Sequence, residues 1–152
     1  MVSLTDDERY TFSSLMTLLI ECEEKLEHYY QMASGRMDNP QLGTVLADYS
    51  KEISRSVQSM RRARVETVVE MALEPITDLN LAQSVRSIDG VIEVGKAGYL
   101  HGLMTMEGAV SQLYLQASPK IANMSAEASE LLMRLSRDSI ERVHKLEQTL
   151  KR

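Results

Sequence analysis

The sequence predicts an all-α protein in which four long helices form a bundle within a single domain, residues 1–152. Over four long stretches, apolar residues recur at intervals of three and four, which is the pattern of amphipathic helices. No stretch of useful length alternates apolar and polar residues as a half-buried strand would. Glycine is sparse, and the three prolines separate the helical stretches at positions 40, 75 and 119.

The first two helices are expected to form a hairpin. The first should cover about residues 6–34, because the hydroxyl of Thr5 can cap it while Glu8 completes a capping box. The second should cover about residues 41–73 and end before Pro75.

The second half of the chain predicts another hairpin. Residues 76–98 contain a short helical pattern and three glycines, which suits a long crossover. A third helix is expected over about residues 99–118, broken by Pro119, and a fourth over about residues 125–150. Two hairpins joined by one long crossover form a known class of four-helix bundle.

Composition excludes several classes of protein. The formal charge is -5, and no basic stripe extends beyond residues 61–64, so nucleic acid is not the expected partner. Acidic residues near the N-terminus and the lack of an apolar run of about 20 residues predict a cytoplasmic protein with no membrane span. The single cysteine, Cys22, cannot form an internal disulfide and is expected in the core.

One motif occurs twice. Glu23 is followed seven residues later by Tyr30, and Glu107 is followed seven residues later by Tyr114. The helix after each motif carries Leu-small-x-x-Ser, which indicates one helical hairpin written twice. On a helical wheel Glu107 lies in the middle of its apolar stripe, whereas Glu23 lies toward the flank but close enough to point into the core of a bundle. A buried carboxylate needs a partner, so that partner is the functional clue.

The two motif helices resemble the first and third helices of rubrerythrin-type members of the ferritin-like superfamily. In that family a metal-ligating Glu is followed seven residues later by Tyr, and the second and fourth helices each supply Glu-x-x-His. The resemblance implies a ferritin-like four-helix bundle in which Glu23 and Glu107 occupy ligand positions of a di-metal centre.

Two registers compete for the remaining ligands. Aligning the second and fourth helices by the repeat places Glu52 and Arg55 against Glu141 and His144, so one literal Glu-x-x-His remains. A set of four carboxylates and one histidine could still hold iron or manganese. The helical wheel opposes this register, because it turns Glu52, Arg55 and Glu141 away from the apolar stripes. The four carboxylates and one histidine of this first register are Glu23, Glu52, Glu107, Glu141 and His144.

The second register uses the buried stripes and puts Ser50 and Ile53, and Ser139 and Arg142, where the family has Glu-x-x-His. Two carboxylates alone are a poor site for a transition metal. The hypothesis is that Arg142 points inward and replaces the charge of the metal. It would pair with Glu107, and in an extended version also with Glu23, with hydrogen bonds supplied by Ser50, Ser139, Tyr30 and Tyr114. In the open alternative, Arg142 faces solvent and Glu107 is paired locally or protonated.

Three functional classes follow. The leading prediction is a ferritin-like protein with a degenerate di-metal site and no cofactor, acting as a non-catalytic binding or structural module and forming a homodimer. The second is a rubrerythrin-like oxidoreductase or peroxidase that uses iron or manganese, and the third is a carrier of a small ligand held between Glu23 and Glu107. No catalytic residue is assigned. One possible partner surface is apolar and consists of Val65, Val68, Val69, Met71 and Leu73.

Overall fold

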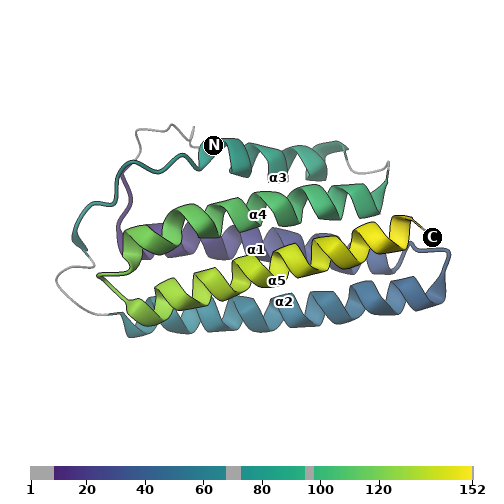
Figure 1. Cartoon of the computed structure of the whole chain (residues 1–152), viewed down its shortest axis with the longest axis horizontal. Helices are drawn as coiled ribbons and strands as arrows, with labels where there is room; N and C mark the ends of the chain where they lie inside the picture. The colour runs from purple at the N-terminus through teal and green to yellow at the C-terminus, as the bar shows by residue number, and fades with distance from the viewer. Residues whose placement is uncertain (1–8, 68–72, 95–97, 152) are drawn as a thin grey trace.

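The protein is built from helices, as the sequence predicted. The computed structural model describes residues 9–67, 73–94 and 98–151. Within these ranges there are five α-helices and no strand beyond one isolated bridge (Figure 1). The helices are α1 (Phe12–Ser34), α2 (Pro40–Glu66), α3 (Ala82–Val94), α4 (Tyr99–Ile121) and α5 (Ala126–Leu150).

The four long helices lie as two neighbouring hairpins. Figure 1 shows α1 beside α2 and α4 beside α5, with the two members of each pair running in opposite directions. The hairpins meet where α1 packs on α4 and α2 packs on α5. Because α2 and α4 run in the same direction, the chain between them must return along the length of the molecule. Helix α3 makes that return on the outer side of α4.

Helix α1 begins later than the sequence predicted. Thr5 and Glu8, the expected cap, lie outside the described residues. The observed cap is Thr11, whose hydroxyl accepts from the Ser14 N–H at 3.1 Å, while the Ser14 hydroxyl accepts from the Thr11 N–H at 2.9 Å. Just before it, Tyr10 exchanges backbone hydrogen bonds of 3.1 and 2.7 Å with Ile76. This bridge to a distant segment holds Tyr10 extended, so α1 begins after it, at Phe12.

Two other helix ends also differ from expectation. Helix α2 ends at Glu66 instead of near residue 73, because Thr67 has an extended backbone. Helix α4 continues through Pro119 to Ile121. A proline withholds one N–H from the carbonyl four residues earlier. That carbonyl belongs to Leu115, an exposed residue, and the helix continues past the proline for a further two residues. Helix α5 starts as predicted, capped by Ser125.

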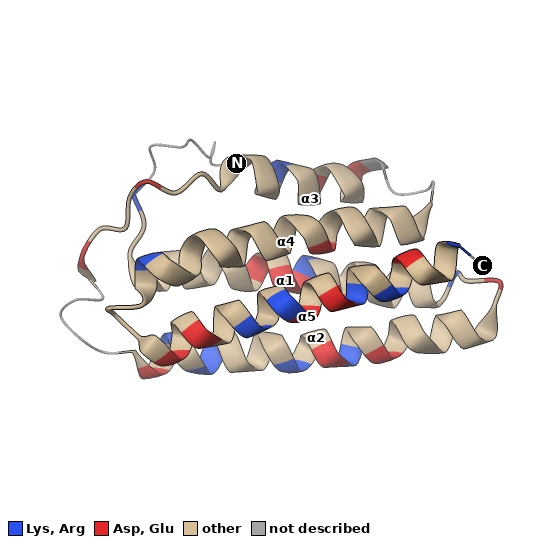
Figure 2. Cartoon of the chain, viewed as in Figure 1, with Lys and Arg blue, Asp and Glu red and all other residues tan. Residues whose placement is uncertain are grey.

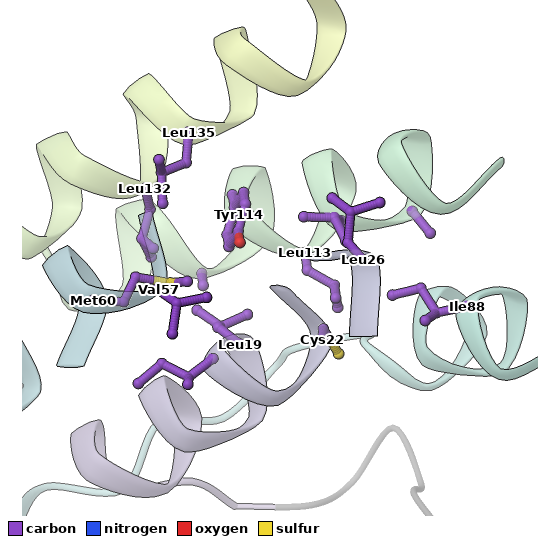
Figure 3. Close-up of a cluster of buried hydrophobic side chains, with 14 of the residues drawn as sticks. Leu19, Cys22, Leu26, Val57, Met60, Ile88, Leu113, Tyr114, Leu132 and Leu135 are labelled. Carbon is purple, nitrogen blue, oxygen red and sulfur yellow. The ribbon is translucent and has the colours of Figure 1, made fainter. Parts of the chain in front are cut away.

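The core runs between the four long helices. Figure 3 shows side chains from all of them meeting there, among them Leu19, Val57, Leu113 and Leu132. Cys22 lies in this core, as predicted, and burial raises the pKa of its thiol to about 12. None of the helices in the described ranges is long and apolar enough to cross a membrane.

Candidate functional site

The two copies of the Glu-x6-Tyr motif bond to each other across the bundle. Tyr30 on α1 donates a hydrogen bond of 2.6 Å to Oε2 of Glu107 on α4. In return, Tyr114 on α4 donates to Oε2 of Glu23 on α1. Seven residues span two helical turns, about 10.5 Å, so on antiparallel helices each glutamate lies level with the tyrosine of the other motif. The carboxylates are completely enclosed, with Glu23 1% and Glu107 0% exposed.

Arg142 makes the ion pair with Glu107 that the sequence predicted. Its Nε donates to Oε2 of Glu107 at 2.5 Å, and its Nη2 donates to Oε1 at 3.1 Å. Such a two-point contact between guanidinium and carboxylate is the strongest form of ion pair in proteins. Ser139, one turn earlier on α5, accepts from Nη2 at 3.4 Å. Burial opposes the charge of Arg142, but Glu107 outweighs it and raises the pKa of the guanidinium above its usual value.

Glu52 reaches the same guanidinium from outside. Nη1 of Arg142 donates to Oε1 of Glu52 at 3.2 Å, and the Glu52 side chain is 42% exposed. The helical wheel had turned Glu52 away from the core, and that expectation was wrong in part. Its side chain is half-exposed on α2 and reaches the guanidinium on α5, so it spans the contact between the two helices. Arg142 therefore bridges the buried carboxylate and the surface.

Glu23 is held differently from Glu107. Its Oε1 is buried and has no hydrogen-bond partner among the described residues. No hydrogen bond or ion pair within those ranges joins it to Arg142, so the extended version of the predicted ion pair is not found. Burial raises the pKa of Glu23 to about 7, although the hydrogen bond from Tyr114 and the charge of Arg142 oppose this rise. The charge of Glu107 adds to the rise.

The remaining predicted residues lie away from this network. The Ser50 hydroxyl, expected to support Arg142, instead donates to the backbone carbonyl of Glu27 at 3.3 Å. The Glu141 side chain is 65% exposed and pairs with Lys145 at 3.3 Å. His144 is 69% exposed and lies 4.0 Å from Glu147. The literal Glu-x-x-His is therefore on the surface and does not meet the buried carboxylates.

These positions do not fit a di-metal centre. Both oxygens of Glu107 are engaged by Arg142, and a cation would compete with the guanidinium for them. In the part of the chain that the structure describes, no group of three or more His, Cys, Asp or Glu side chains could hold a metal ion. What the network can do is hold one fixed ion pair and, at Glu23, one exchangeable proton.

Two polar contacts between α4 and α5 were missed by sequence reasoning. The Ser111 and Ser136 hydroxyls lie 2.7 Å apart, and those of Ser118 and Ser129 lie 2.8 Å apart. The sequence contained a signal for these contacts. The two serines on α4 are seven residues apart, and so are the two serines on α5. On antiparallel helices this equal spacing brings both pairs level at once.

Comparison of the chain with protein-family models, curated proteins and solved structures finds no match.

Proposed function

We propose that this protein is a ferritin-like helical bundle that has lost its di-metal centre and acts as a non-catalytic binding or structural module. The observation that carries the proposal is the contact of the Arg142 guanidinium with both oxygens of Glu107. When the chain is aligned with the rubrerythrin-type proteins that it resembles, Glu107 occupies the position of a metal ligand and Arg142 occupies the position of a ligating histidine. A permanent cation there supplies the positive charge that a metal would have supplied.

The chemistry of the network supports a structural role. Arg142 occupies both oxygens of Glu107, and the tyrosine hydroxyls donate hydrogen bonds to the two carboxylates. Burial together with the neighbouring carboxylates raises the pKa of Tyr30 and Tyr114 above the usual range of tyrosine, so neither phenol is activated as a base. Glu107 and Arg142 lie within the core and are 0% and 4% exposed, out of reach of a large substrate.

Metal analysis tests the proposal directly. Protein purified from cells grown with added iron and manganese should contain far less than one equivalent of either metal. If it instead carried about two per chain, as di-metal bundles do, and lost them on Glu107→Ala, the protein would be the di-iron or di-manganese oxidoreductase of the alternative prediction.

Restoring the missing ligands tests the ferritin-like register itself. The variant Ser50→Glu, Ile53→His, Ser139→Glu, Arg142→His rebuilds Glu-x-x-His on both buried stripes and should bind about two Co²⁺ ions per chain, seen by visible absorption. The matched control is Arg55→His, which completes Glu-x-x-His in the other register and should bind none at this site. If only the control bound cobalt, the ligands would belong to the other register, and the register proposed above would be wrong.

The carrier alternative has one observation in its favour, the unpartnered Oε1 of Glu23. Two grooves in the described part of the chain, of about 880 and 320 Å³, are lined by none of the network residues Glu23, Glu107, Tyr30 and Tyr114. A carrier would need a cavity next to these groups, so the non-catalytic module is the better supported proposal.

A further inference from the structure

Charged residues are distributed unevenly over the helices. Figure 2 shows Lys, Arg, Asp and Glu along the length of α2 and α5 and very few on α4. On α4 these types are represented by Glu107, which is buried, and Lys120, in the last turn. A helix that faces water normally carries charges on its outer side, whereas the centre of a protein–protein interface is depleted of them. The part of α4 that its neighbours α1, α3 and α5 leave exposed therefore has the composition of an interface.

The residues on this side follow the spacing of a helix–helix contact. They recur at intervals of four and three, as do the contact positions of two packed helices. We call them the α4 seam: His101, Thr105, Gly108, Gln112, Leu115 and Pro119. Five of the six are exposed and Gly108 is half-buried. Helix α5 contacts α4 through Ser111 and Ser118, and α3 packs on α4 beside the seam. The exposure of the seam residues shows that neither neighbour covers them.

The middle of the seam is open. A Cβ atom added at Gly108 would meet no atom within 4 Å. A groove of about 320 Å³ lies beside it between α3 and α4, and its lining includes Thr105, Gln112, Ser84 and Ser87. The groove lining contains amides and hydroxyls and no charged side chain. A neutral polar side chain from another molecule could enter here without an unpaired charge being desolvated.

We propose that the α4 seam pairs with the α4 seam of a second copy of the chain, antiparallel, about a two-fold axis level with Val110. The seam has the same spacing in both directions, so His101 meets the partner's Pro119 and Thr105 meets the partner's Leu115. Gly108 meets the partner's Gln112, and each glutamine lies over the gap left by a glycine, within reach of the hydroxyls in the groove. Such self-complementary pairing is the requirement of a two-fold interface.

The antiparallel arrangement follows from the sizes of the residues. In a parallel pair each residue would face its own copy, so Gly108 would face Gly108 and leave a void. In the antiparallel pair, each contact brings a larger residue of one copy against a smaller residue of the other. It also brings no like charges together, which would oppose association.

Other surfaces are less suited to a second copy. The groove of about 880 Å³ between α2 and α5 is larger, but three arginines and three glutamates line it, and a partner would have to desolvate them. Of the apolar surface expected from the sequence, Val65 and Leu73 are 71% and 78% exposed. Its other members, Val68, Val69 and Met71, lie outside the described residues.

Sedimentation equilibrium over a range of protein concentrations tests the interface. The native chain should dimerise, and Gln112→Arg should weaken dimerisation by about tenfold or more, because the two introduced guanidinium groups would lie about 6 Å apart along the helix axis. The matched control is Gln148→Arg, the same substitution at an exposed position of α5, which should leave the dimer unchanged. A native chain that stays monomeric at about 100 µM, or a dimer that Gln112→Arg does not weaken, overturns the proposal.

Cross-linking tests the orientation. The single variants Gly108→Cys and Gln112→Cys, one of them carrying a mass tag, should form a disulfide with each other when they are mixed and oxidised. Each variant alone should form little, because an antiparallel seam separates identical residues. Cys22 is buried and remains unreactive in both. Efficient cross-linking of either variant with itself would show a parallel or different interface and contradict the proposal.

Discussion

The two halves of the repeat hold their buried carboxylates in different ways. Glu107 receives a hydrogen bond from Tyr30 and two more from Arg142, whereas Glu23 receives one, from Tyr114, and its second oxygen has no partner in the described structure. The position on α2 that corresponds to Arg142 is Ile53, which is fully buried. The half with arginine at this position pairs its carboxylate with a guanidinium, whereas in the half with isoleucine burial raises the pKa of the glutamate to about 7.

This difference keeps the interior close to neutral. The charges of Arg142 and Glu107 offset each other in their ion pair, and Glu23 adds no charge while it is protonated, below its pKa of about 7. Ionisation of Glu23 would leave one net negative charge in the core, at a cost of several kcal/mol before compensation. Burial of two identical motifs therefore does not lead to two identical charge states, because the second helix of each hairpin decides whether a cation is present.

Among the substitutions that test this difference, removal of Arg142 should change the free energy of unfolding most. Arg142→Met leaves Glu107 buried without its cation and should lower the free energy of unfolding by about 3–5 kcal/mol, measured by urea denaturation. Arg137→Met, at an exposed position of the same helix, is the control and should change it by less than about 0.5 kcal/mol.

A second substitution shows whether the uncompensated charge causes that loss. Adding Glu107→Gln to Arg142→Met removes the charge but keeps an acceptor for Tyr30, so much of the lost stability should return. A double variant as unstable as Arg142→Met alone would mean that the packing of the arginine side chain, and not its charge, stabilises this half.

The pH dependence of Glu23 should give the next largest effect. Its pKa of about 7 in the folded protein exceeds the usual unfolded value of about 4.3, so the folded state binds this proton more tightly. The stabilisation is complete below about pH 4 and is lost as pH rises to about 7. Glu23→Gln should remove this loss and be more stable than the native chain by on the order of 3 kcal/mol at pH 8.

Urea denaturation of both proteins at pH 5, 6, 7 and 8 measures the difference. The control is Glu21→Gln, exposed on the same helix, whose profile should follow that of the native chain. Parallel profiles for Glu23→Gln and the native chain would mean that Glu23 is paired with a group absent from the network described above.

Removal of either tyrosine hydroxyl should lower the free energy of unfolding by a smaller amount, and the two amounts should differ. Tyr114→Phe removes the hydrogen bond that Glu23 receives and should cost about 1–3 kcal/mol at pH 8, whereas Tyr30→Phe should cost about 1 kcal/mol because Arg142 still binds Glu107. Loss of the Tyr114 bond should also raise the pKa of Glu23, moving the pH-dependent loss of stability upward. Equal costs would contradict the unequal partnering of the two carboxylates.

Glu52 should have the smallest effect. Glu52→Gln removes a half-exposed partner of Arg142 and should cost less than about 1 kcal/mol. Because the pair is screened by solvent, the cost should shrink further in high salt. Urea denaturation with and without added salt measures it, and a cost above about 2 kcal/mol would mean that Glu52 belongs to the buried ion pair.

Much of this network could be predicted from helical periodicity alone. Residues that share the apolar stripe of a helix share its buried side, which was enough to bury Glu107. Arg142 lies on the flank of its stripe, and its inward orientation was one of two alternatives that the sequence left open. The wheel was less accurate at the edge of a stripe, where it turned Glu52 outward although its carboxylate reaches Arg142. Whether an edge residue is buried depends on the neighbouring helix, which a wheel of one helix does not contain.

The sequence by itself determined the helices, the repeated Glu-x6-Tyr motif and the need for a partner at each buried carboxylate, because these follow from local spacing and burial. Only the tertiary structure decided that each tyrosine serves the glutamate of the other motif, across 77 and 91 residues of chain. It also assigned Arg142 to Glu107 and not to Glu23. The physical reason is that hydrogen bonds between helices depend on how far one helix is shifted along the other, and the packing of α1 on α4 and of α4 on α5 sets that shift.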